Sequence, residues 1–363
     1  MRSYIQSYSY NDFNQGILGK IPDSLNIISG ITNSRYKAFH SNPNLYDIES
    51  TAVILAVADE VVVGRLTIYP TSMMIDGKIE IVMGGSDLYV DESYRQEAAG
   101  TDLMIYPVFD KYYRYILYAG ASPQALPIYK KLKYQIIEYP RMMQLRNSRC
   151  ILESKGLHGA FLKIASSITN IPLKAILAFN NLTTRIMSKK YVIEKVSHVP
   201  AWVDDILKND RHKYKEVHDQ KWLQWNLDYH FTDAPENIQS FYIVKKDNEE
   251  LGYFMTKERY RNLAGGVLKD VIIGSIVEWG SFDETILTEK DIYILAMSTF
   301  SNKLDILEFA SNDSEVTKAM KKYFFLKHGF AHILFMDKQR KHTDASDINN
   351  WRVRYGYADV ILS

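Results

Sequence analysis

The chain has 363 residues, of which 46% are hydrophobic and 24% are charged, and its formal net charge is +1. These proportions are ordinary for a globular protein, and the length suffices for two domains of roughly 100 to 200 residues each. The near-neutral charge argues against a polyanionic partner, so we expect no nucleic acid to bind.

Cysteine content and hydropathy bear on location. Cys150 is the only cysteine, so the chain forms no internal disulfide. Residues 1–10 lack the apolar stretch of a signal peptide, and we expect no stable membrane insertion because no run reaches the ~18 apolar residues of a span. We therefore expect a cytoplasmic protein.

The first elements predicted are three adjacent strands. Residues 51–58 and 60–69 are apolar runs joined at a short acidic turn, and a third run, 79–83, follows the hairpin signal Asp76-Gly77. The three strands form a meander that leads into residues 87–101.

Small residues then open a helix that we expect to run to about Tyr113. The first amides of a helix have no partner inside it, so a turn of small residues there can close on an anion. The sequence therefore predicts a cradle for a diphosphate at residues 95–101. Next come a strand at 115–118, a helix at 124–132, and strands at 135–138 and 142–145.

Two segments carry a family resemblance. Residues 95–100, Arg-Gln-Glu-Ala-Ala-Gly, resemble the Arg/Gln-x-x-Gly-x-Gly/Ala loop with which GNAT-superfamily acyltransferases grip coenzyme A, with Ala98 in place of the first glycine. Residues 122–134 resemble the family's Asn-x-x-Ala-x-x-x-Tyr-x-x-x-Gly-Phe segment. Ser122 stands in the Asn position, and Lys133-Tyr134 stands for Gly-Phe. The order of strands and helices is also that of the family.

The resemblance implies roles for the residues of this first unit. Coenzyme A would place its diphosphate on the amides of the loop and its pantetheine arm along the end of the third strand, whose backbone near Tyr89 or Val90 would donate to the oxyanion. Ser122 would hydrogen-bond the pantetheine arm. The residues implied for the donor are Leu88, Tyr89, Val90, Arg95, Gln96, Glu97, Ala98, Ala99, Gly100, Thr101 and Ser122.

Two further residues are candidates for proton transfer. Tyr129 would protonate the departing thiolate, and Asp87 would take a proton from the acceptor ammonium. Glu80 is the other candidate base. Since it lies seven residues from Asp87, strict alternation puts the two on opposite faces unless a bulge intervenes. Each assignment has a structural alternative: the small residues pack the helix on the sheet, Tyr129 packs its helix, and Asp87 is a solvated strand end.

Residues 155–190 have apolar positions at helical spacing around Pro172. They could form an amphipathic hairpin on a membrane, but a stripe of this kind more often packs on its own domain. We treat the segment as a connector.

After residue 195 the pattern of strands and helices begins again, with strands at 241–245, 251–256 and 271–279. The cradle is missing here, because Asp283 and Glu284 stand where a diphosphate would bind. Segments at 211–226 and 350–359 resemble tandem GNAT proteins found near bacterial polysaccharide loci. Trp222, Trp225 and Trp351 would suit a sugar acceptor or fill the second core.

The sequence thus predicts a mixed α/β (α+β) fold of two tandem GNAT-like units, each a mostly antiparallel sheet flanked by helices. The boundaries are 1–150, 151–195 for the helical connector, and 196–363. The implied activity is an acetyl-CoA-dependent N-acetyltransferase acting on an amine or amino-sugar acceptor in a ternary complex. The alternatives are a Fem-type aminoacyl transferase and a non-catalytic acyl-CoA-binding module. No metal is expected, since the histidines lack metal-site spacing, and His212, His218 and His230 are expected at the surface.

Overall fold

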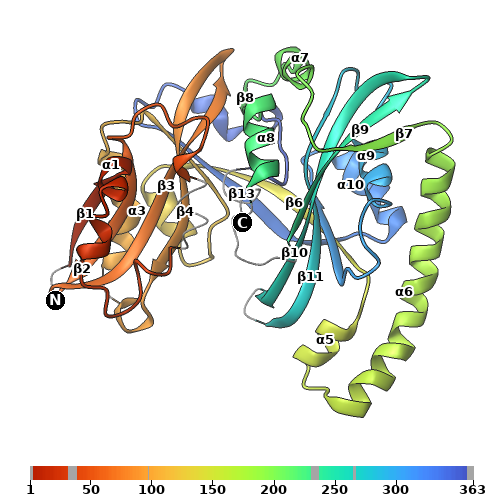
Figure 1. Cartoon of the computed structure of the whole chain (residues 1–363), viewed down its shortest axis with the longest axis horizontal. Helices are drawn as coiled ribbons and strands as arrows, with labels where there is room; N and C mark the ends of the chain where they lie inside the picture. Colours follow the sequence, from red (N-terminus) through yellow and green to blue (C-terminus); the bar gives the residue numbers. More distant parts are fainter. Residues whose placement is uncertain (1–2, 32–38, 97, 230–236, 265–266, 358–363) are drawn as a thin grey trace.

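A computed structural model describes residues 3–31, 39–96, 98–229, 237–264 and 267–357 (Figure 1). Its framework is a mixed sheet of 13 strands in the order β1-β2-β3-β4-β5-β13-β6-β12-β11-β10-β9-β7, with β8 paired to β3. A single sheet therefore runs through both halves of the chain.

The first half contains the predicted meander. Both hairpins turn through residues of positive φ, at Asp59-Glu60 and at Asp76-Gly77, as two-residue hairpin loops require. Its elements are β1 (Ser3–Ser9), α1 (Tyr10–Asn14), β2 (Thr51–Ala58), β3 (Val61–Ile75), β4 (Lys78–Val90), α3 (Ala99–Phe109), β5 (Tyr115–Ala119), α4 (Leu126–Lys131) and β6 (Gln135–Leu145).

The helix α3 is shorter than predicted, because Asp110 leaves the helical conformation (φ −56°, ψ 134°) and accepts the Tyr112 N–H. The two strands predicted around residue 140 are one strand, β6. Pro140 is tolerated in it because the neighbouring β13 is irregular opposite this point, between Lys327 and Phe330.

The second half repeats this pattern. Its elements, with those that connect the halves, are α5 (Arg149–Ser154), α6 (Gly159–Met187), β7 (Val192–Val196), α7 (Val203–Asn209), β8 (Tyr214–Glu216), α8 (Gln220–Asp228), β9 (Ile238–Lys246), β10 (Glu249–Ala264), β11 (Leu268–Ser281), α9 (Glu289–Ala296), β12 (Ile306–Ala310), α10 (Ser314–Met320) and β13 (Leu326–Asp337). In each half an antiparallel meander is followed by a strand parallel to its last member, β5 beside β4 and β12 beside β11.

The halves exchange their last strands. β13 lies between β5 and β6, and β6 lies between β13 and β12. Such pairings join residues about 200 positions apart, as in the pair Ile333 and Ala119. The predicted fold class is confirmed, and the exchange explains why the sheet is continuous. The boundaries near residues 150 and 195 stay predictions.

Among the described residues, three of the four apolar cores that accompany the sheet are large. One lies under α3 and α4, another under α9 and α10, and the third joins residues from both halves, including Tyr69, Trp222, Phe241 and Trp351. Figure 1 shows α8, which carries Trp222, between the two halves. Trp222, Trp225 and Trp351 thus belong to this shared core, and Trp222 and Trp351 are at most 1% exposed.

The predicted connector forms α5 and a single helix, α6, which continues through Pro172 for 29 residues. It stands at the side of the molecule (Figure 1). The expectation that its apolar stripe packs on its own domain was wrong, since residues such as Phe161 and Ile171 are 81% and 65% exposed. By length and composition alone, α6 could cross a membrane.

Candidate functional site

The candidate site begins where β4 and β5 part. The two strands pair in parallel through Met83–Ile116 and Gly84–Leu117, although β4 continues to Val90. The ring of Tyr118 lies directly over Gly85, where an added Cβ would stand 2.1 Å from a ring carbon. Glycine is therefore required at position 85, and the strands separate beyond it.

A β-bulge in β4 lies at the same level. Arg65 of β3 pairs with Tyr89, whereas Thr67 pairs with Ser86, so β4 has one residue more than β3 between these pairs. Asp87 takes the left-handed conformation there, with φ +57°. The bulge interrupts the regular alternation of side chains at Asp87, so the alternation counted from Glu80 does not fix the face on which Asp87 lies.

Two cavities occupy the space between the separated strands. The smaller, about 230 Å³, lies between the ends of the two strands and is lined by Asp87, Leu88, Ser122 and Tyr129 among others. The larger, about 650 Å³, extends to the start of α3. Its lining includes Leu88, Val90, Arg95, Gln96, Gly100, Thr101 and Ser122. Leu88, Ser122 and Ala125 line both cavities, so they form one continuous wall.

The first turn of α3, whose amides have no partner four residues back in the helix, borders the larger cavity. Ala98 is the N-cap residue and makes no side-chain capping hydrogen bond, and the first helical bond runs from Asp102 N to Ala98 O at 2.8 Å. Ala98 is in the right-handed helical region (φ −70°, ψ −10°), so its backbone does not need the glycine found in the related motif. Gly100 and Thr101 face the cavity from this first turn.

The remaining residues of the predicted loop differ in position. The Arg95 side chain is half-exposed and donates from Nε to the Val90 carbonyl oxygen at 3.2 Å and from Nη1 to Glu92 at 3.1 Å. Ala99 is buried in the core under α3. Ala98 is exposed, and it is not among the described residues that line the two cavities. Glu97 lies outside the described residues.

Tyr129 lines the smaller cavity. Its ring is 5% exposed and packs against Tyr118 and Tyr134, with ring centroids 5.8 Å and 5.0 Å apart. Burial raises the pKa of the Tyr129 phenol, so the hydroxyl is protonated at neutral pH. Ser122 stands beside it, and its Oγ accepts the N–H of Ala125 at 3.2 Å.

Asp87 and Tyr89 both contact Arg65. The Arg65 Nε donates to the Asp87 carboxylate at 2.9 Å, and the guanidinium lies 5.2 Å from the centre of the Tyr89 ring. The Asp87 side chain is 21% exposed and faces the smaller cavity. It is thus an ion-paired carboxylate at the cavity wall. Tyr89 points away from both cavities toward Arg65.

The equivalent split in the second half is filled by the chain itself. Gly356 donates its N–H to the Val277 carbonyl at 2.8 Å, and the Tyr355 hydroxyl donates to Glu308 at 2.6 Å. The tail therefore lies along β11 between this strand and β12. The sequence reasoning missed this plug, although the run of aromatic and arginine residues at 351–357 was a signal for it.

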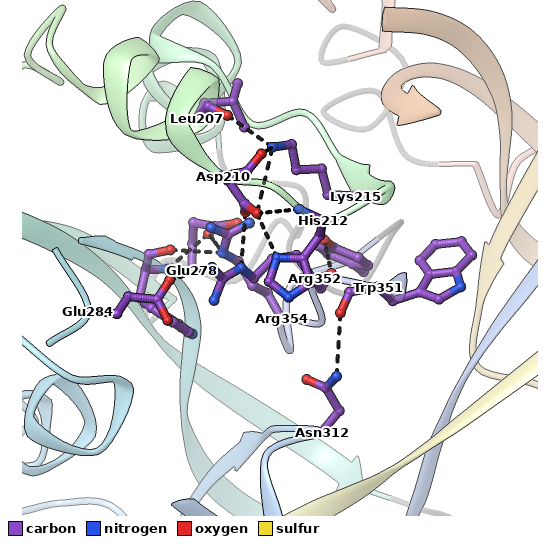
Figure 2. Close-up of polar contacts among 12 residues, drawn as sticks. Leu207, Asp210, His212, Lys215, Glu278, Glu284, Asn312, Trp351, Arg352 and Arg354 are labelled. Atoms are coloured by element: carbon purple, nitrogen blue, oxygen red, sulfur yellow. Dashed lines mark hydrogen bonds and ion pairs between the residues drawn. The ribbon is translucent and has the colours of Figure 1, made fainter. Parts of the chain in front are cut away.

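The acidic residues of the second half are satisfied by neighbours. Figure 2 shows Arg352 bonded to Glu284 and Arg354 bonded to Glu278. The expectation that Asp283 and Glu284 repel a diphosphate stays a prediction, and the tail beside β11 is a second, steric reason against a donor in this half.

A buried histidine lies near this cluster, contrary to the expected surface position. His218 is 2% exposed, is bonded to Glu278, lies 3.4 Å from Glu216, and stacks on Trp222 with centroids 3.8 Å apart. Burial alone would lower the pKa of His218, but the two carboxylates raise it to about 9. The Nδ1–H of His212 instead donates to the ionised Asp210 carboxylate at 2.6 Å, and His230 lies outside the described residues.

A third cavity of about 600 Å³ borders this polar cluster and is lined by residues such as His212, Lys213 and Arg352. It lies at the far end of β4, since Lys213 accepts the Asp76 N–H at 3.1 Å just before that strand begins. From residue 78 to 87 a strand rises ~30 Å. This cavity and the split near Asp87 therefore lie toward opposite ends of β4.

Comparisons with known proteins give fold relationships. No protein-family model and no curated protein sequence matches the chain. Among solved structures, yeast (Saccharomyces cerevisiae) N-myristoyltransferase with bound myristoyl-CoA is 12% identical, with 92% of this chain and 82% of that chain covered and a TM-score of 0.57.

Two bacterial structures also have a fold similar to that of this chain. A GCN5-related N-acetyltransferase from Anabaena variabilis is 10% identical, with 93% of this chain and 73% of that chain covered and a TM-score of 0.53. A probable N-acyltransferase from Enterococcus faecalis is 13% identical over the same shares, 93% and 73%, with a TM-score of 0.52. The chain therefore has the tandem fold of the GNAT-superfamily acyltransferases.

Proposed function

We propose that the chain is an acyl-CoA-dependent acyltransferase that binds its donor between β4 and β5. The observation that carries the proposal is the coincidence of the strand split, the bulge at Asp87 and the continuous cavity wall with the residues that the sequence motifs select. The donor diphosphate would accept from the amides at the start of α3. The pantetheine arm would lie along the edge of β4 from Leu88 to Val90.

The chemistry proposed at the smaller cavity is direct transfer. The nitrogen of an acceptor amine attacks the thioester carbonyl, the new N–C bond forms, and the C–S bond breaks. A backbone N–H of the bulged strand near Tyr89 or Val90 would stabilise the oxyanion. Asp87 would accept the proton that the ammonium loses before it attacks, and Tyr129 would donate its proton to the thiolate. The second proton, which the nitrogen loses as the amide forms, would return to the Tyr129 oxygen.

We further propose an acetyl group as the cargo and an amine or amino sugar as the acceptor. Asp87 and Tyr129 both line the smaller cavity, about 230 Å³, so the acyl group and the thioester would lie there during transfer. This space favours a short acyl chain. A cytoplasmic location agrees with a coenzyme A donor.

The alternatives receive less support. A Fem-type transferase would need a basic channel for transfer RNA, and the chain has a net charge of only +1. A non-catalytic module with a degenerate loop is argued against by Ala98, whose helical backbone accepts alanine without strain.

A charge placed in the cradle tests the proposal. Thr101→Glu adds a carboxylate to the first turn of α3, where it favours the helix but repels a diphosphate. Ser314→Glu adds the same charge to the exposed first residue of α10 and serves as the matched control.

Calorimetric titration with acetyl-CoA and with free coenzyme A measures the effect. We expect the wild type and the control to bind equally and Thr101→Glu to bind at least ~10-fold more weakly, a loss of about 1.4 kcal/mol. Equal affinity in all three proteins would remove the cradle from the proposal.

A further inference from the structure

The helix α6 turns an apolar face to solvent. Its large apolar side chains recur at spacings of three, four and eight residues, and they are between 49% and 81% exposed. They are Phe161, Ile164, Ile168, Ile171, Phe179, Leu182 and Ile186. At 100° per residue they fall in a stripe ~80° wide that follows the whole helix for ~40 Å. We call these seven residues the apolar stripe.

The face of α6 that contacts the protein is instead partly polar. Asn180 and Thr184 are 2% and 3% exposed, and the Thr184 hydroxyl donates to the Asn180 carbonyl at 2.9 Å. Nearer the start of the helix, the Asn170 side chain accepts the Ser148 N–H at 2.9 Å. A helix on the surface of a globular protein normally buries its apolar stripe. In α6 this arrangement is reversed, so the apolar stripe is not what holds the helix to its own chain.

The charges of this segment have one sign. Residues 154–193 contain six lysines and arginines and no aspartate or glutamate. Three of them, Lys163, Lys174 and Arg185, are exposed and eleven residues apart, so they form a row along one edge of the apolar stripe. An apolar stripe bordered by a row of cations is the pattern of a helix that lies in the interface of an anionic bilayer.

We propose that α6 docks the protein on the surface of an anionic membrane, with the helix parallel to the bilayer plane. The apolar stripe would enter the boundary between headgroups and acyl chains, and the cation row would meet the lipid phosphates. This inference does not depend on the proposed transferase activity.

Two other arrangements fit the observations less well. In a dimer built on α6, two cation rows would meet with no acidic residue of the helix to pair them. In a membrane span, Lys174 would lie in the hydrocarbon, and Asn170, Asn180 and Thr184 would leave their partners. Docking on the surface keeps every contact of the buried face.

Vesicle co-sedimentation of the full chain tests the proposal. The vesicles contain phosphatidylcholine alone or phosphatidylcholine mixed with phosphatidylglycerol. The stripe variant carries Ile164→Ser, Ile168→Ser and Leu182→Ser. Its matched control carries Leu263→Ser and Val267→Ser, which are 51% and 59% exposed at the β10–β11 hairpin. A charge variant carries Lys163→Gln, Lys174→Gln and Arg185→Gln, and thermal unfolding checks that each protein is folded.

We expect the wild type and the matched control to sediment with the anionic vesicles and to bind neutral vesicles much more weakly. The stripe variant should bind at least ~10-fold more weakly, because each buried methylene group contributes. The charge variant should lose affinity by on the order of 100-fold, at about fivefold for each cation.

Three results would overturn the proposal. The wild type could fail to bind anionic vesicles, or both variants could bind as tightly as the wild type. Alternatively, light scattering could show a dimer that the stripe variant dissociates, which would identify a second copy of the chain as the occupant of the apolar stripe. If the stripe variant does not fold, the charge variant still tests the proposal, because its apolar stripe is intact and only its contact with anionic lipid is weakened.

Discussion

Gly356 donates its backbone N–H to the carbonyl oxygen of Val277 over 2.8 Å, so the C-terminal tail lies along β11 where that strand leaves β12. In the first half, the corresponding edge of β4 faces a cavity instead. The two halves share one strand arrangement, but only the first keeps its split open. This asymmetry assigns the donor site in our proposal to the first half.

The Gly85 position tests whether the split must be open. Gly85→Ala places a Cβ 2.1 Å from a carbon of the Tyr118 ring, so this ring, which lines the smaller cavity, has to move. We expect acetyl-CoA to bind at least ~10-fold more weakly and the protein to lose about 1 to 3 kcal/mol of stability. Calorimetric titration and chemical denaturation measure the two effects. Gly19→Ala, with no atom within 4 Å of its added Cβ, is the control. Unchanged affinity in Gly85→Ala would argue against a donor between these strands.

The phenol of Tyr129 tests the proposed acid. Tyr129→Phe keeps the ring packing with Tyr118 but removes the proton donor. We expect kcat to fall by ~100-fold or more while the affinity for acetyl-CoA stays unchanged. Tyr134→Phe removes a hydroxyl from the same aromatic cluster and should retain activity. If the two variants turn over equally, Tyr129 only packs its helix.

The carboxylate of Asp87 tests the proposed base. Asp87→Asn keeps the shape of the side chain but cannot accept the ammonium proton. Turnover of a basic amine should fall by ~100-fold, whereas an amine that is already neutral at pH 7 should lose much less. Steady-state rates with the two acceptors make the comparison. An equal loss with both amines would assign Asp87 to positioning through its ion pair with Arg65.

The buried His218 predicts a pH dependence of stability. Its pKa is raised to about 9 in the folded protein, against 6.5 for the free side chain. The imidazolium therefore stabilises the fold fully below pH 6.5, and this contribution disappears as the pH rises toward 9. The free energy of unfolding should fall by roughly 3 kcal/mol across this range.

Denaturation curves at several pH values check this dependence. His218→Gln should remove the slope above pH 6.5, and the exposed His328→Gln should leave it unchanged. Glu289 also affects stability, but at lower pH. Burial raises the pKa of its carboxyl group from 4.5 to about 7, so its protonated form stabilises the fold fully below pH 4.5, and this contribution is lost as the pH rises to 7. A flat profile above pH 6.5 in the wild type would contradict the charged state of His218.

A substitution in the C-terminal tail tests whether the donor binds in the first half alone. Tyr355→Phe removes the hydrogen bond to the buried Glu308, which should cost about 1.5 to 3 kcal/mol of stability. Acetyl-CoA affinity should not change, because the tail fills the second half and not the donor site. Tyr112→Phe, at an exposed position, is the control for stability. A parallel loss of acetyl-CoA affinity would place the donor in the second half.

Local patterns allowed much of the fold to be predicted. The apolar runs and the Asp76-Gly77 turn indicated the strands of the meander, and residues 95–101 indicated the turn before α3. These features depend on neighbours in the sequence. The exchange of β6 and β13 depends on pairs such as Ile333 and Ala119, which no local pattern specifies.

The site was predicted in part for the same reason. The motifs selected residues such as Ser122 and Tyr129, and the structure brings them to one cavity wall. The bulge at Asp87 was not predictable, because it follows from the pairing of β4 with β3. The burial of His218 was also missed, because its partner Glu278 lies 60 residues away along the chain. The apolar residues of α6 have helical spacing, and a stripe with this spacing can either pack on the protein or face solvent. The spacing alone therefore could not predict that the stripe is exposed.

The most direct test of the central claim is a crystal structure of the protein with coenzyme A. We expect the diphosphate on the amides of residues 99–101 and the pantetheine arm beside Leu88 and Val90. Coenzyme A bound in the second half, against Gly356 and Val277, would contradict the proposed donor site. The same conclusion would follow if side chains filled the space between β4 and β5 in a crystal soaked with coenzyme A.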